Sequence, residues 1–110
     1  RPGRRRPMSS MLGALHLHEA TRKFDDDLER YVRLARHAAT LTRLTRRISM
    51  LSNPRRTHRG LQLRAACTAY DQTLLLAAED LGLSPGLTPP LHSVERLSLE
   101  AELVSAGMRW

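Results

Sequence analysis

The stretch FDDDLERYVRLARHAATLTRLTRRISMLSNP, from Phe24 to Pro54, decides the fold of this 110-residue chain. Its apolar residues recur three or four positions apart, which is the spacing of one face of an α-helix. They are Phe24, Leu28, Tyr31, Leu34, Ala38, Leu41, Leu44, Ile48 and Leu51. Pro54 lacks a backbone donor and disfavours the α conformation at Asn53. We therefore predict one helix over about residues 10–51, followed by a turn.

A second helix is predicted over about residues 57–81. Its main apolar stripe consists of Leu63, Cys67, Tyr70, Leu74, Ala77 and Leu81. Further apolar residues fall on another side, namely Ala65, Ala69, Leu76 and Leu83. A helix that is apolar on two sides packs against neighbours on both, so this helix should be central. Gly82 should follow its end as a left-handed cap, because prolines come soon after.

A third helix is predicted over about residues 91–106. Its apolar stripe is expected to be Val94, Leu97, Ala101, Val104 and Met108. Gly107 should cap this helix and let Met108 fold back on Leu103. Trp110 should cover the end of the bundle, with the role of an aromatic anchor for a partner as the alternative.

These helices predict an all-α fold: a long antiparallel helical hairpin plus a shorter third helix, a three-helix bundle that dimerisation could complete. The chain has only four aromatic residues, so its core should be leucine and alanine. The length suits one domain, over residues 9–110, after a basic flexible leader at 1–8. Met8 followed by two serines is a plausible natural start.

The predicted helices differ in length, and this difference suggests an association surface. At 1.5 Å per residue they would run roughly 60, 37 and 24 Å. Folding back at Pro54, the second helix would cover the first only down to about Asp26. The start of the first helix would lack an intrachain partner, which is typical of a surface for a homodimer or a helix-in-groove partner. The expected apolar contact residues are Met11, Leu12, Leu15, Leu17 and Phe24. Alternatively, the helix breaks near Gly13 or within residues 39–45, and its start folds inward.

Arginines dominate the predicted corner between the first two helices. From Arg30 to Arg64 the chain contains ten arginines and no acid. Cations near the end of the first helix would offset its dipole, but the start of the second helix favours acids and has arginines instead. The expected basic contact residues are Arg36, Arg43, Arg46, Arg47, Arg55, Arg56 and Arg59.

Three uses of this corner stay open. It could bind an acidic protein partner, or it could bind nucleic-acid backbone phosphates through the region Arg43–Arg64. Against nucleic acid, the arginines have no interleaved aromatics, and no zinc finger or helix-turn-helix is recognisable. Arginine outnumbers lysine by 17 to 1, so part of the charge reflects a GC-rich coding sequence and would be simply solvated.

No catalytic or metal site is predicted, and no cofactor. The segment His16–Asp27 contains a His-x-x-Glu spacing once, whereas a di-iron bundle needs Glu-x-x-His on two helices. Its acids should form a solvated face or contact the basic corner of another chain. Cys67 is the only cysteine and should pack in the core, so no intrachain disulfide is possible. No apolar run is long enough for a membrane span, and we predict a cytoplasmic, non-enzymatic interaction module.

Overall fold

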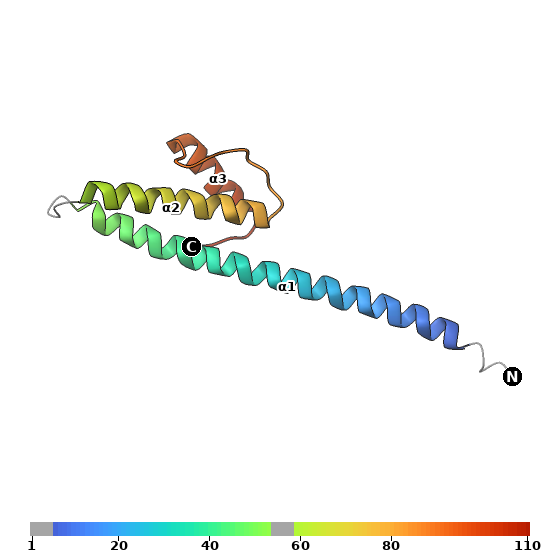
Figure 1. Ribbon diagram of the computed structural model, residues 1–110. Coiled ribbons are helices and arrows are strands. Elements are labelled where there is room, and N and C mark those ends of the chain that lie inside the picture. Colours follow the sequence, from blue (N-terminus) through green and yellow to red (C-terminus); the bar gives the residue numbers. More distant parts are fainter. Residues whose placement is uncertain (1–5, 54–58) are drawn as a thin grey trace. The chain divides into compact units, whose positions relative to one another are not determined.

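The computed structural model describes the backbone of residues 6–53 and 59–110, and the side chains of residues 17–53 and 59–110. Within these ranges the chain forms three helices and no strand. They are α1 (Arg6–Leu51), α2 (Arg59–Asp80) and α3 (Ser93–Ser105) (Figure 1). The all-α prediction, with a long first helix and a short third one, is confirmed. The helix ends differ from the predicted ones by only a few residues.

Helix α1 runs without interruption past Gly13 and through residues 39–45, so the alternative of a broken helix is wrong. The threonines do not break it because their hydroxyls bond within the helix. Thr42 Oγ1 donates to the carbonyl of Ala38 at 3.0 Å, and Thr45 Oγ1 donates to that of Leu41 at 2.8 Å. Threonine can form such bonds to the preceding turn without leaving the helical conformation.

The chain divides into two compact units, and the division falls within α1. Unit 1 ends at Tyr31, and its described part is helical. Unit 2 covers residues 32–110 and contains the rest of α1 together with α2 and α3.

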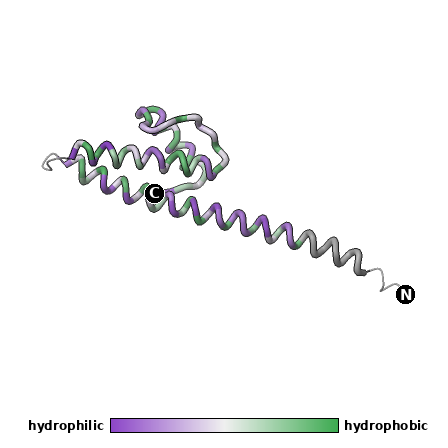
Figure 2. Tube along the Cα trace, in the orientation of Figure 1, coloured by the Kyte–Doolittle hydropathy of each residue, from purple (hydrophilic) through white to green (hydrophobic). Residues whose placement is uncertain are grey.

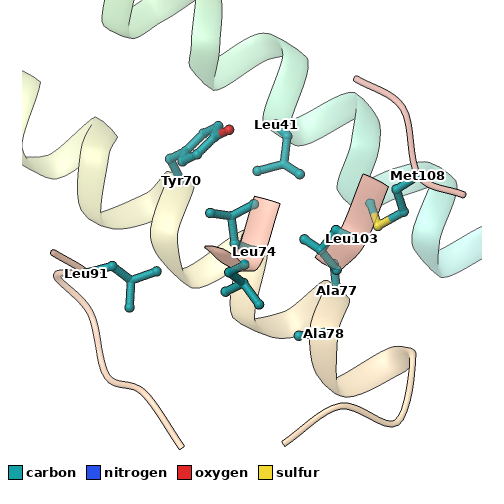
Figure 3. Close-up of a cluster of buried hydrophobic side chains, with 9 residues drawn as sticks. Leu41, Tyr70, Leu74, Ala77, Ala78, Leu91, Leu103 and Met108 are labelled. Atoms are coloured by element: carbon teal, nitrogen blue, oxygen red, sulfur yellow. The ribbon is translucent and has the colours of Figure 1, made fainter. Parts of the chain in front are cut away.

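The hydrophobic core lies in unit 2 (Figure 3). Its buried members are Leu41, Tyr70, Leu74, Ala77, Ala78, Leu91, Leu99, Leu103 and Met108. The α1 residues Leu34, Ala38, Leu44 and Ile48 pack against this cluster, as the stripe predicts. Helix α2 lies between the end of α1 and α3, which confirms its predicted central place (Figure 1). Leucine and alanine supply most of the core, as expected.

The second apolar side of α2 differs from the prediction. Leu76 and Ala65 are exposed, whereas Ala66, Thr73 and Ala78 are buried. Of these three, only Ala78 lies next to Asp71 on the helix, where the segment before α3 contacts α2 through the N–H of Leu91. Ala66 and Thr73 lie on the other flank of the main stripe.

The predicted core face of α3 is wrong in a similar way. Val94 and Leu97 are 75% and 66% exposed, and Ala101 and Val104 are also exposed. The buried residues of α3 are Leu99 and Leu103. Leu99 and Leu103 lie three and seven positions after Arg96, on the same face of the helix. Because Arg96 is bound to α2, it turns this face toward the core.

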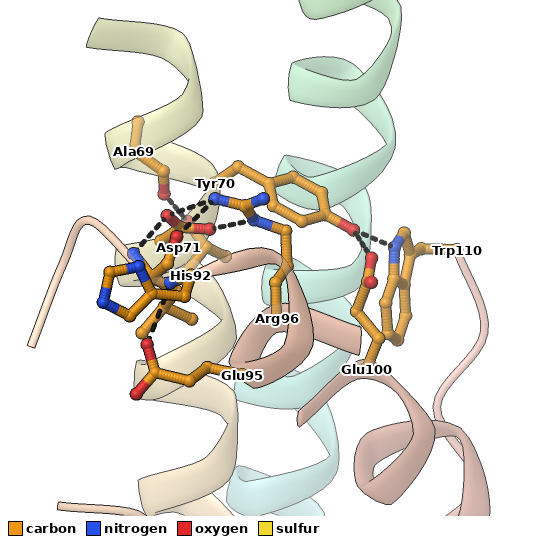
Figure 4. A network of polar contacts seen from close by, with 10 residues as sticks. Ala69, Tyr70, Asp71, His92, Glu95, Arg96, Glu100 and Trp110 are labelled. Carbon is orange, nitrogen blue, oxygen red and sulfur yellow. Dashed lines mark hydrogen bonds and ion pairs between the residues drawn. The ribbon is translucent and has the colours of Figure 1, made fainter. Parts of the chain in front are cut away.

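An ion pair between Asp71 of α2 and Arg96 of α3 makes that connection (Figure 4). Asp71 has no exposed surface. Arg96 Nε donates to its Oδ1 at 2.6 Å and Arg96 Nη2 to its Oδ2 at 2.9 Å, a two-pronged contact. The backbone N–H of Leu91 also donates to Asp71 Oδ2 at 2.9 Å, and Arg96 Nη2 donates to the carbonyl of Leu91 at 3.0 Å. One carboxylate thus holds both the incoming loop and α3.

Glycine caps end α2 and α3, as predicted. Gly82 and Gly107 have φ values of 78° and 104°, in the left-handed region that favours glycine. After Gly107, the N–H of Met108 donates to the carbonyl of Leu103 at 3.0 Å, and Met108 is buried. This is the Schellman pattern, and it returns the chain to the core.

We predict that Asp71→Ala lowers the free energy of unfolding by about 3 kcal/mol, because it leaves the Leu91 N–H and the Arg96 guanidinium without their buried acceptor. The matched control is Asp80→Ala. Asp80 also binds an arginine, Arg33 of α1, but this pair is partly exposed and its loss should cost less than about 1 kcal/mol. Urea unfolding followed by circular dichroism measures both values. Equal losses for the two variants would contradict the assigned role of Asp71.

Candidate functional site

Unit 1 carries an exposed apolar stripe, which we call the N-terminal stripe. Its members are Leu17, Phe24, Leu28 and Tyr31, which are 71%, 66%, 50% and 70% exposed. Of the predicted apolar contact residues, Leu17 and Phe24 belong to it. The side chains of Met11, Leu12 and Leu15 lie outside the described residues. Every described side chain from residue 17 to 31 is exposed, and the stripe is the main apolar feature among them.

Charged residues surround the N-terminal stripe, and Figure 2 shows that residues 17–31 are mostly hydrophilic. At about 100° per residue, Asp25 and Asp27 fall on opposite flanks of the stripe. Asp26 and Glu29 fall on the far side of the helix. Arg22 Nη2 donates to His18 Nε2 at 3.0 Å, one turn apart. The stripe is therefore an apolar line with a carboxylate on each flank.

Unit 2 contains an open groove at the hairpin of α1 and α2, which we call the arginine groove. Its volume is about 510 Å³. It is lined by Ala39, Thr42, Arg43, Arg46, Arg47, Met50, Leu51 and Gln62. The three arginines are all exposed, so their guanidinium groups are accessible to a partner. Three of the seven predicted basic residues thus lie together around one hollow.

The other predicted basic residues do not line this groove. Arg36 is exposed on α1, and Arg55 and Arg56 lie outside the described residues. Arg59 is half-buried, and its Nη1 donates to the carbonyl of Ser52 at 3.0 Å, just after the end of α1. A carbonyl at a helix C-terminus needs an external donor and attracts a cation. The arginine at the start of α2 therefore links that helix to the end of α1.

Sequence reasoning missed the contact that joins the far ends of this hairpin. Asp80 accepts from Arg33 Nε at 3.3 Å and from His37 Nε2 at 2.8 Å. An acid at the end of α2 is unfavourable for the helix dipole, so the two α1 side chains compensate it. Counting back equally from Leu51 and Arg59 places Asp80 opposite about Arg30, so residue counting indicates the region of α1 but not the two partners.

A second polar contact closes the C-terminal end of the chain (Figure 4). Tyr70 donates its hydroxyl to Glu100 Oε2 at 2.5 Å, and Trp110 Nε1 donates to the Tyr70 hydroxyl at 3.1 Å. Burial, followed by the hydrogen bond to Glu100, raises the pKa of Tyr70 to about 12. Trp110 packs against the core, in line with the predicted end-covering role. Within the described residues, every buried side-chain nitrogen or oxygen has a hydrogen-bond partner.

The remaining hollows lie around the segment between α2 and α3. Two of them, of about 590 and 400 Å³, share Ser84, Pro85 and Leu87 in their linings. Among the residues that the structure describes, no three His, Cys, Asp or Glu side chains are grouped so that they could hold a metal ion. Cys67 is half-buried on α2. No helix within the described ranges is both long and apolar enough to cross a bilayer.

The fold and these two surfaces define the class: an all-α protein in which a helical hairpin is closed by a short third helix. No protein-family model matches the chain, and neither curated proteins nor solved structures give a significant match. The N-terminal stripe and the arginine groove are therefore the features of the molecule that indicate its function.

We predict a loss of stability at alkaline pH that depends on Tyr70. Its pKa of about 12 in the folded protein lies above the ordinary value of 10. The protonated hydroxyl of Tyr70 therefore contributes fully to the free energy of unfolding below pH 10. This contribution is lost as the pH rises through 12, which lowers the free energy of unfolding by about 2 kcal/mol. The Tyr70→Phe variant should be about 1 kcal/mol less stable than the wild type at pH 9. Because it has no hydroxyl to ionise, its free energy of unfolding should fall less than that of the wild type between pH 9 and 12. Urea unfolding at both pH values tests this, and parallel losses in the two proteins would refute it.

Proposed function

We propose that this protein is a non-catalytic helical module for protein–protein interaction and assembly that self-associates through the N-terminal stripe. The observation that carries the proposal is the exposure of Leu17, Phe24, Leu28 and Tyr31, in a unit whose described side chains are all exposed. Large apolar side chains grouped on one face of a soluble helix usually mark a contact surface.

The spacing within the stripe supports a helical partner. Leu17, Phe24 and Tyr31 are spaced seven residues apart. Thr21 and Leu28 lie between them on the same face of the helix, four positions after Leu17 and Phe24. A repeat of seven with such intermediate positions is the pattern of helices that pack side by side in a coiled coil. The rest of the surface is charged, as expected for the outer face of such a helix.

The energetics of an isolated helix point in the same direction. Helical stability in proteins comes mainly from packing of an apolar face, because propensity and surface ion pairs contribute little. Burial of each large side chain of the stripe would contribute about 1.5–3 kcal/mol. Docking against a partner would therefore stabilise unit 1 as well as the complex.

The proposed module is not an enzyme and is cytoplasmic. The polar clusters around Asp71, Tyr70 and Asp80 are engaged in hydrogen bonds between helices. The chain has a single cysteine, so it draws no stability from an intrachain disulfide of the kind common in oxidising compartments.

We predict that Phe24→Ser with Leu28→Ser raises the dissociation constant for self-association at least about tenfold, because two apolar contacts are lost. The matched control is Val94→Ser with Leu97→Ser, which removes two equally exposed apolar residues from α3. Sedimentation equilibrium at several concentrations measures the effect. A wild-type protein that stays monomeric at high concentration, or equal effects of both pairs, would reject the proposal.

A second candidate function is nonspecific binding of nucleic acid, which is favoured by the convergence of Arg43, Arg46 and Arg47 on one groove. Guanidinium groups bind phosphate oxygens through paired hydrogen bonds. We predict retention on duplex DNA at 50 mM salt that is lost by 200 mM, and a salt slope reduced by about 2–3 when the three arginines become Gln. Absence of retention at 50 mM salt would exclude this function.

A further inference from the structure

We infer that the N-terminal stripe of one copy docks in the arginine groove of a second copy, and that the second copy returns the same contact. This inference rests on the proposed self-association, and it names the surface that receives the stripe. The two surfaces belong to different units of the chain, so the pairing differs from a coiled coil formed by two stripes.

Charge complementarity carries the inference. The stripe has Asp25 and Asp27 on its flanks, and the groove is lined by Arg43, Arg46 and Arg47 without any acid. All five side chains are exposed. No ion pair among the described residues engages any of these five groups. Two stripes packed together would instead bring four aspartates to one seam, where like charges repel.

The apolar parts also match. Ala39 and Met50 line the groove with exposed apolar surface. Methionine adapts its shape and makes favourable contacts with aromatic rings, which suits the exposed ring of Phe24. An arginine in the groove can also stack on the ring of Tyr31. Aromatic side chains with acids beside them are therefore suitable occupants of this groove.

One antiparallel register aligns these residues along the two helices. If α1 of one copy runs antiparallel to α1 of the other with Phe24 level with Met50, Asp27 is level with Arg47 and Tyr31 with Arg43. A two-fold dimer requires that each contact occur twice, with the partners exchanged. The pairing meets this condition, because each copy has one stripe and one groove.

Charge reversal in two variants tests the inference. The stripe-reversed variant carries Asp25→Lys and Asp27→Lys, and the groove-reversed variant carries Arg43→Glu, Arg46→Glu and Arg47→Glu. Each variant alone presents like charges on both surfaces, so its dissociation constant should rise at least about tenfold. Mixed together, the two variants are complementary at both contacts and should form a heterodimer. Sedimentation velocity with one labelled variant measures both results.

Matched controls separate the contact from general charge effects. Asp26→Lys with Glu29→Lys changes the charge of unit 1 equally, on the far side of the helix, and should leave self-association within about twofold of wild type. A milder groove variant, in which the three arginines become Gln, avoids placing acids near the end of α1 and should still weaken association. Circular dichroism checks that each variant is folded.

Disulfide trapping tests the register in a Cys67→Ser background. Phe24→Cys on one chain should cross-link to Met50→Cys on another, whereas Phe24→Cys alone should not cross-link to itself. The outcomes distinguish failure of this inference from failure of the proposed function. If self-association survives groove reversal and Phe24→Cys on one chain cross-links to Phe24→Cys on another, the inference is overturned and the proposed function is kept. A monomeric wild type would overturn both.

Discussion

The arrangement of unit 2 depends on a single buried carboxylate. Asp71 has no exposed surface, and it accepts hydrogen bonds from Arg96 of α3 and from the backbone of Leu91. A buried charge is costly unless it is fully paired, so this site favours one arrangement of the loop and of α3 over others. The face of α3 that carries Leu99 and Leu103 turns inward as a result. The apolar residues on its other side are left exposed.

Apolar and charged surface therefore remains outside the core in specific places. The N-terminal stripe of unit 1 and the outer face of α3 are both exposed, and both contain apolar residues seven positions apart. The stripe differs in having Asp25 and Asp27 on its flanks, opposite in charge to the arginine groove. The arginines likewise separate into two groups. Arg33 binds Asp80 and Arg59 binds the end of α1, whereas the three arginines of the groove form no ion pair with the described residues. Association through oppositely charged surfaces would use the groups that the fold itself does not require.

Much of the fold could be predicted from residue spacing because helices have a fixed period. The stripe from Leu34 to Leu51, the turn after Leu51 and the glycine caps at Gly82 and Gly107 all follow from local rules. The candidate site was predictable in part: clustering of Arg43, Arg46 and Arg47 follows from their spacing on one helix. Their grouping with Gln62 and the hydrogen bond of Arg59 to Ser52 were not predictable, because they depend on how α2 packs against the end of α1.

The sequence by itself determined the helical class, the order and approximate lengths of the helices, and the polarity of each segment, because all of these depend on residues less than two turns apart. The tertiary structure alone decided which apolar face of α3 is buried. Val94 with Leu97 and Leu99 with Leu103 are both acceptable stripes by periodicity. The choice between them comes from a hydrogen-bonded ion pair across 25 residues of chain, between Asp71 and Arg96, which no local pattern encodes.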